Sequence, residues 1–119
     1  SMAPVQYSLQ NDSQGMGGFI YKDLYNKIGN KIDYFNVQFY YDYSVNGYDK
    51  IIENGYPINK IIVGSISSLN FDNVIKVLKT LKNKYKDFAG AFNWEYFDSP
   101  PNSFLPGLWS YYIYTSLYF

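Results

Sequence analysis

The sequence contains no cysteine, no histidine and no arginine among its 119 residues. Without cysteine and histidine, disulfides, the common zinc sites and Ser-His or Cys-His catalysis are excluded, and we expect no metal and no cofactor. All ten basic residues are lysine, and ten acidic residues balance them. Nucleic-acid binding normally needs a basic surplus rich in arginine, so nucleic acid is not an expected partner. No apolar run reaches the roughly 18 residues of a membrane span, so no membrane partner is expected.

Aromatic residues are abundant instead, at 22% of the chain, and 15 of them are tyrosine. Hydrophobic residues make up 47% and charged residues 17%, which predicts one globular domain over residues 1–119. A genome biased toward Tyr, Asn, Ile and Lys explains the overall excess. It does not explain why large aromatic side chains follow the ends of the expected strands.

Strand patterns alternate with helix patterns along the whole chain. Strands are expected to start near residues 2, 33, 60 and 89, and helices at 19–28, 48–54, 71–85 and from 106 toward 117, with a turn at Asn46-Gly47. This order predicts an α/β fold of four consecutive βα units with parallel strands and right-handed crossovers. Two architectures fit: a small open sheet, or half of a (β/α)8 barrel, which needs about 250 residues.

The clearest helical pattern lies in residues 71–85, where either Asn70 or Asp72 can cap the start. Its apolar positions share one stripe, and most of its lysines fall on the other side, which indicates a solvated face. The stripe consists of Val74, Val77, Leu78, Leu81 and Tyr85. In the last helix Trp109, Ile113 and Leu117 form a similar stripe.

The second strand alternates between polar and apolar residues. Asn36, Gln38 and Tyr40 point to one face, and the intervening Phe and Val residues point to the other. Its polar face ends at Tyr40, at the carboxyl edge where parallel sheets bind their ligands. Both a ligand-binding strand and a strand with satisfied buried amides fit this alternation.

Trp94 ends the last strand, after the small residues 89–91 and before a polar loop that ends at Pro100. Small side chains allow another backbone or a ligand to approach closely. Trp94 is therefore either a stacking platform for a sugar ring or a core residue that fills the end of a barrel. The nearby carboxylates are Asp42, Glu95 and Asp98, and none of them is assigned as a catalytic acid.

These residues resemble family 18 of the glycoside hydrolases, the chitinases and endo-β-N-acetylglucosaminidases. The resemblance is to the C-terminal half of their (β/α)8 barrel and covers nearly the whole chain. Residues 1–4 resemble its fifth strand, 32–40 the sixth with the run Val37-Gln38-Phe39-Tyr40, 61–65 the seventh, and 90–96 the eighth with its strand-ending Trp94.

The resemblance implies cleavage of β-1,4-linked N-acetylglucosamine glycans, in which the N-acetyl carbonyl of the substrate attacks the anomeric carbon with overall retention. It assigns Tyr40 a catalytic role, holding that carbonyl. It assigns Gln38, Tyr40, Trp94 and Asp42 to substrate binding, with Trp94 as the floor beneath the sugar. Tyr41 and Asp42 stand where the family often has Asn after Tyr40, which puts the contacts of Asp42 in doubt. The resemblance also favours a secreted protein.

The family's Asp-Gly-x-Asp-x-Asp-x-Glu strand, which supplies the acid, does not occur in this sequence. We therefore expect a fragment of a hydrolase, inactive by itself, that pairs with the missing N-terminal half-barrel or with a second copy. Because the chain opens on an expected strand, its N-terminus is expected to lie upstream. A non-catalytic carbohydrate-binding or self-assembling structural protein on the same scaffold is the second hypothesis. An unrelated small α/β binding domain is the third.

Overall fold

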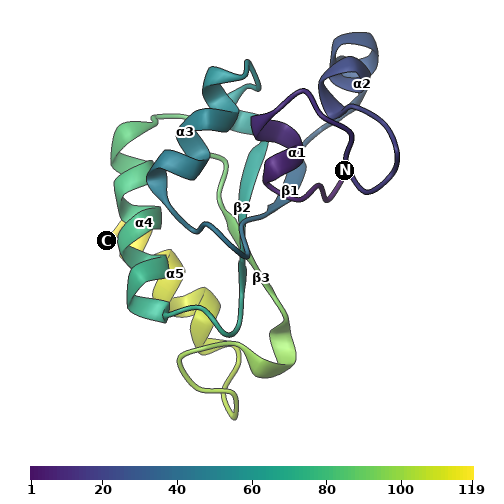
Figure 1. Ribbon diagram of the computed structural model, residues 1–119. Helices are drawn as coiled ribbons and strands as arrows, with labels where there is room; N and C mark the ends of the chain where they lie inside the picture. Colours follow the sequence, from purple (N-terminus) through teal and green to yellow (C-terminus); the bar gives the residue numbers. More distant parts are fainter.

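A three-stranded parallel sheet forms the centre of the computed structural model, which describes residues 1–119. The strands β1 (Phe35–Gln38), β2 (Ile61–Ile66) and β3 (Ala91–Trp94) lie side by side in that order (Figure 1). Gln38 is opposite Gly64, which is opposite Phe92. Residues in register share a face of the sheet, so alternate residues of the three strands form two common faces.

The N-terminal segment lies along β1 in the place of a fourth strand. Met2 and Val5 form isolated parallel bridges, and the amides of Asn36 and Gln38 donate to the carbonyls of Met2 and Pro4 at 2.8 and 2.9 Å. Pro4 has no N–H to donate, and the short helix α1 (Tyr7–Gln10), which the sequence pattern did not predict, follows at once. The predicted α/β class is confirmed, whereas the predicted four regular strands are three strands and a bridged edge.

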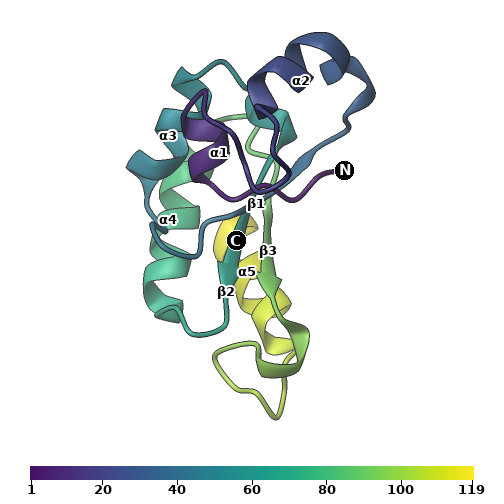
Figure 2. The same cartoon turned by 45° about the vertical axis from the view of Figure 1, so that its right-hand side comes forward.

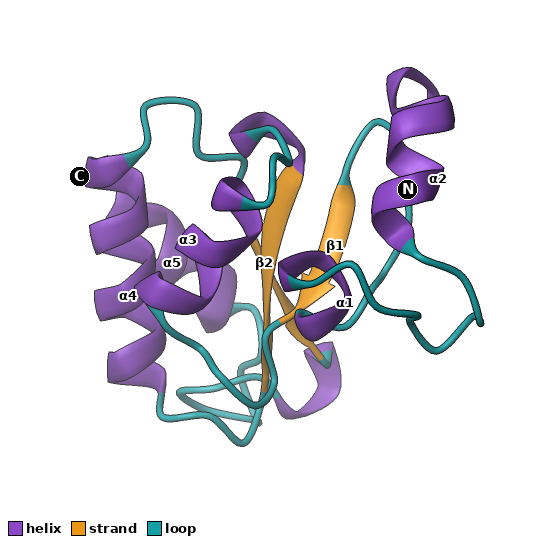
Figure 3. Cartoon of the chain, turned by 45° about the horizontal axis from the view of Figure 1, so that its top comes forward, coloured by secondary structure: helices purple, strands orange, loops and turns teal.

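Helices cover only one face of this sheet. In Figures 1 and 3, α3 (Val45–Glu53), α4 (Phe71–Lys84) and α5 (Leu108–Tyr118) lie on the same side of β2, and α2 (Tyr21–Ile28) lies beyond β1. The core fills the space between the sheet and the helices, where Phe35, Val37 and Phe39 are completely buried. Phe35 packs against Tyr21 and Tyr25 of α2. The predicted apolar face of β1 therefore packs on the helices. None of the helices is both long enough and apolar enough to span a bilayer.

The two strongest helix predictions are confirmed. The side chain of Asn70 caps α4 by accepting a hydrogen bond from the Asn73 amide at 2.9 Å. Val74, Val77, Leu78 and Leu81 of the predicted stripe are buried, and Tyr85 packs against the core. In α5, Ile113 is buried, and Trp109 and Leu117 pack partly buried against the same core.

The turn predicted at Asn46-Gly47 is wrong, because these residues lie in the first turn of α3. The Ser44 hydroxyl caps this helix by accepting from the Gly47 amide at 2.9 Å. Gly47 is buried, and a Cβ there would lie 3.1 Å from the Asp42 carbonyl oxygen, so glycine permits this close approach. The last strand is shorter than predicted, since Gly90 has a φ of +132° and regular pairing begins only at Ala91.

Candidate functional site

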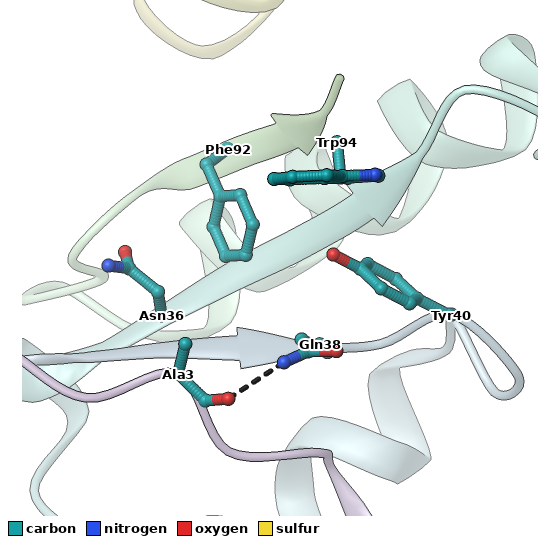
Figure 4. A pocket seen from close by; sticks show the side chains of 6 residues that line it. All are labelled: Ala3, Asn36, Gln38, Tyr40, Phe92 and Trp94. Atoms are coloured by element: carbon teal, nitrogen blue, oxygen red, sulfur yellow. Dashed lines mark hydrogen bonds between the residues drawn. The ribbon is translucent and has the colours of Figure 1, made fainter.

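The face of the sheet without helices carries a hollow of about 570 Å³. Its walls come from the N-terminal segment, from β1 and the residues after it, and from β3 (Figure 4). The lining residues are Ala3, Asn36, Gln38, Tyr40, Phe92 and Trp94. The structure thus brings together Gln38, Tyr40 and Trp94, three of the four residues predicted for the site, although they are up to 56 positions apart in the sequence.

Strand register explains the shape of this hollow. Gly64 lies between Gln38 and Phe92 and has no side chain, so the Phe92 ring lies against its Cα. A Cβ at Gly64 would lie 2.7 Å from the carbonyl oxygen of Val37 and would overlap the Phe92 ring. Glycine therefore keeps the middle of the hollow open. Phe92 was missed in the sequence prediction, although it lies two residues before Trp94 and hence on the same face.

Gln38 joins the hollow to the bridged edge of the sheet. Its side-chain Nε2 donates to the carbonyl oxygen of Ala3 at 2.7 Å, and its own amide donates to Pro4 at 2.9 Å. The side-chain oxygen of Gln38 has no partner in the protein and faces the hollow (Figure 4). It can accept a hydrogen bond from a ligand hydroxyl or amide.

Tyr40 and Trp94 stand opposite each other at the carboxyl end of the strands, and the Tyr40 hydroxyl points toward the indole (Figure 4). Partial burial raises the pKa of Tyr40, so its hydroxyl keeps its proton at neutral pH and can donate a hydrogen bond. The Trp94 side chain is 59% exposed. Within this chain it forms a wall of the hollow and does not fill the core, which was the other role its position allowed.

Asp42, the fourth predicted binding residue, does not line the hollow. It is exposed, and its backbone carbonyl accepts from the Gln6 side chain at 2.9 Å, which anchors the turn between β1 and α3. Glu95 and Asp98 are also exposed and lie outside the hollow, in the loop that extends past the end of the sheet in Figure 2. No group of three or more carboxylate, histidine or cysteine side chains is placed to hold a metal ion.

The hollow thus combines one phenol, two side-chain amides and two apolar rings, and has no carboxylate. An aromatic surface with a few fixed polar groups suits a ligand that has both apolar faces and hydrogen-bonding edges. It can hold and orient such a ligand, but it contains no group able to serve as a general acid near pH 7. Fold and site together define a parallel α/β sheet with an aromatic-lined hollow at the carboxyl edge of its open face.

Two solved glycosidase structures are similar to this chain. A fungal endo-β-N-acetylglucosaminidase from glycosyl hydrolase family 18 superposes with a TM-score of 0.81 and 28% identity, over 97% of this chain and 44% of that chain. A chitinase, ChiC, from Aspergillus fumigatus gives a TM-score of 0.77 and 26% identity, over 98% of this chain and 46% of that one. No protein-family model and no curated protein matches the sequence.

These similarities confirm the resemblance to family 18 chitinases and endo-β-N-acetylglucosaminidases. The chain spans less than half the length of each of the two glycosidases. Structurally it is therefore a glycoside hydrolase-like fragment.

Proposed function

We propose that the chain forms the sugar-binding wall of a family 18-type hydrolase and binds β-1,4-linked N-acetylglucosamine glycans in the open-face hollow. The observation that carries the proposal is the convergence of Gln38, Tyr40 and Trp94 on one hollow. It is supported by similarity to two glycosidases across nearly the whole chain. The substrate-binding role for Asp42 is not retained, because its side chain does not reach the hollow.

Each lining residue has a role that its chemistry permits. The Tyr40 hydroxyl donates to the N-acetyl carbonyl oxygen and holds it in line with the anomeric carbon, which that oxygen attacks. The Trp94 indole stacks against the apolar face of the sugar ring, and the Gln38 side-chain oxygen accepts from a sugar hydroxyl or amide. Such orientation contributes to the rate only when an acid protonates the leaving oxygen. Because the hollow has no carboxylate, that acid belongs to another part of the enzyme.

A complementary half-barrel is the partner that the exposed surface favours. Helix α5 has no charged residue, and Tyr111, Tyr114 and Tyr118 on its outer side are all more than half exposed. A helix that is apolar on every side is normally buried. At the opposite end of the molecule, Phe19, Ile20 and Leu24 line a second surface hollow along α2. Helix α5 thus has uncovered apolar surface, whereas the hollow along α2 also has Gln14, Asp23 and Lys27 in its lining. The outer strand edges are open to pairing.

Sedimentation equilibrium of the chain separates this partner from a second copy. A complementary half-barrel predicts a monomer, with a sedimentation profile that Tyr114→Lys leaves unchanged. A dimer that Tyr114→Lys dissociates would show instead that a second copy covers α5. The matched control is Lys50→Glu at an exposed residue of α3, away from α5, which should leave the oligomeric state unchanged in either case.

A non-catalytic carbohydrate-binding protein is the second candidate function. It is favoured by the absence of any carboxylate from the lining of the hollow. Hydrolysis of a chitin oligosaccharide after mixing with a complementary half-barrel would decide for the enzyme. Binding without hydrolysis in the same mixture would decide for the second candidate.

Titration with tetra-N-acetylchitotetraose tests the binding proposal directly. The background is Trp109→Phe, so that Trp94 is the only emitting tryptophan; this change also removes a buried indole N–H that has no partner. We expect saturable quenching or enhancement of Trp94 fluorescence, and about tenfold weaker binding by calorimetry in Trp94→Ala, which removes roughly 1.4 kcal/mol of stacking. Cellotetraose, which lacks the N-acetyl groups, is the control. No response to the chitin tetramer, or an equal response to cellotetraose, would contradict the proposal.

A further inference from the structure

A partly buried polar cluster lies behind Trp94, on the helix-covered face of β3. Its centre is Asn93, which alternation places on the opposite face from the Trp94 indole. The Asn93 side-chain oxygen accepts from the Ser65 hydroxyl on β2 at 2.8 Å. Its Nδ2 donates to the hydroxyls of Ser67 and Ser99 at 3.0 and 3.1 Å. Ser65 is only 1% exposed and Ser99 only 3%, whereas Asn93 and Ser67 are half-buried, so these bonds are partly shielded from water.

The same cluster holds the backbone that carries the indole. The Trp94 carbonyl oxygen accepts from the Ser67 amide at 2.8 Å, and the Glu95 amide donates to the Ser67 hydroxyl at 3.1 Å. The Glu95 carbonyl oxygen accepts from the Ser99 hydroxyl at 2.9 Å and from Asn93 Nδ2 at 3.3 Å. The peptide groups that follow Trp94 are thus all hydrogen-bonded to Asn93 or to a serine that Asn93 contacts.

Trp94 depends on this support because little else fixes its direction. Its side chain is 59% exposed and lies outside the buried core. Asn93, by contrast, connects three segments at once: β2 through Ser65, the start of the β2–α4 connection through Ser67, and the loop after β3 through Ser99. Fixed hydrogen bonds behind a side chain are the usual means by which a binding group is held in its productive orientation.

We propose that Asn93 is a positioning residue that orients the Trp94 indole for stacking beneath a sugar ring, a proposal that rests on the function proposed above. Asn93 does not touch the ligand. The serine-linked Asn93 amide fixes the backbone at the end of β3, and that backbone fixes the indole. These bonds also explain the polar residues on an otherwise apolar, helix-covered face, since the buried hydroxyls of Ser65 and Ser99 must have partners.

The test is Asn93→Asp in the Trp109→Phe background. Aspartate keeps the size of the side chain and the acceptor for Ser65 but loses the donated bonds to Ser67, Ser99 and the Glu95 carbonyl. Without ligand, we expect lower Trp94 fluorescence anisotropy and stronger acrylamide quenching. With tetra-N-acetylchitotetraose, we expect affinity to fall about tenfold, the effect of losing roughly one hydrogen bond. The matched control is Asn83→Asp, at an exposed residue of α4 with no side-chain bond.

The outcomes separate the two proposals. If the unsubstituted chain does not bind the tetramer but Asn93→Asp lowers the anisotropy, the proposed function fails and the positioning of Trp94 stands. If the chain binds and Asn93→Asp behaves like Asn83→Asp in anisotropy and affinity, the positioning role is overturned. Should circular dichroism show that Asn93→Asp is unfolded, Ser99→Ala removes one bond to the same backbone, and unchanged anisotropy in that variant overturns the proposal.

Discussion

Consecutive residues of the same strand serve two different faces of this molecule. Phe35, Val37 and Phe39 are completely buried beneath the helices, whereas Gln38 and its even-numbered neighbours line an open hollow. The first set belongs to the core, and the second set lines the hollow. Because neighbouring side chains of a strand point to opposite faces, one alternating strand supplies residues to the core and to the site separately.

In β3 the chemistry of the two faces is reversed. There the open face carries Phe92 and Trp94, and the helix-covered face carries the amide of Asn93 with its serine partners. An exposed indole beside the hollow and a half-buried amide behind it both run against the usual preference for burying apolar groups. Such a reversal is expected where a strand end is shaped for binding, which agrees with the binding site proposed at the end of β3.

Deleting an aromatic ring from each face in turn should give the largest difference in the free energy of unfolding. Phe35→Ala should lower the free energy of unfolding by about 3–5 kcal/mol, since it leaves a cavity among packed rings. The nearest of these rings is Tyr56, with a centroid distance of 5.7 Å. Trp94→Ala, on the open face, should change stability by less than about 1 kcal/mol, because its side chain is mostly exposed. Urea unfolding followed by circular dichroism measures both, and equal losses would contradict the distinction between the faces.

A methyl group added on the open face should have the next largest effect on the free energy of unfolding. Gly64→Ala should destabilise the chain by about 1–3 kcal/mol, because the new Cβ meets the Val37 carbonyl at 2.7 Å and the Phe92 ring. It should also weaken binding of the chitin tetramer by displacing Phe92. The matched control is Gly107→Ala, where nothing lies within 4 Å of the new Cβ and φ is −61°, so stability should hold or rise slightly. If Gly64→Ala behaves like Gly107→Ala, the close packing at Gly64 is not a constraint.

Much of the fold could be predicted because it depends on the spacing of apolar residues and on the residues that cap helices. The stripe of α4, its Asn70 cap and the alternation of β1 are local patterns, and each appears in the structure. The convergence of Gln38 and Trp94 also followed, once parallel strands were expected to end at one edge. These features need only neighbours in sequence and a general rule about sheets.

The remaining features depend on contacts that no local pattern displays. Asn46-Gly47 has a strong turn signature, yet Ser44 caps a helix there and tertiary packing around Gly47 decides the conformation. Asp42 follows the site in sequence but does not line the hollow. The Asn93 cluster joins residues from β2, β3 and two connecting segments, so it becomes visible only after the chain is folded.

The smallest expected effect on stability comes from the charge of Asp49, on the helix-covered side of the sheet. Asp49 of α3 accepts from Lys84 and Tyr85 at 2.6 and 2.5 Å and so joins α3 to α4 and the residue after it. Burial alone would raise the pKa of Asp49, but the hydrogen bonds from Lys84 and Tyr85 outweigh it and hold that pKa below its ordinary value. The hydrogen bond to Asp49 raises the pKa of Lys84.

The signs of these shifts fix how stability should change with pH. Because the pKa of Asp49 is lowered by folding, its carboxylate stabilises the fold above about pH 4, and this stabilisation is lost as the pH falls through the pKa of the folded state. Because the pKa of Lys84 is raised by folding, its ammonium group stabilises the fold up to about pH 10, and this stabilisation is lost at higher pH. Asp49→Asn should therefore lower the urea midpoint slightly at pH 7, and the difference should shrink toward pH 3. Asp87→Asn, at an exposed residue without an ion pair, is the control. A difference that is the same at pH 3 and pH 7 would show that the Asp49 charge does not join the two helices, and that the helix-covered side is held by its apolar packing alone.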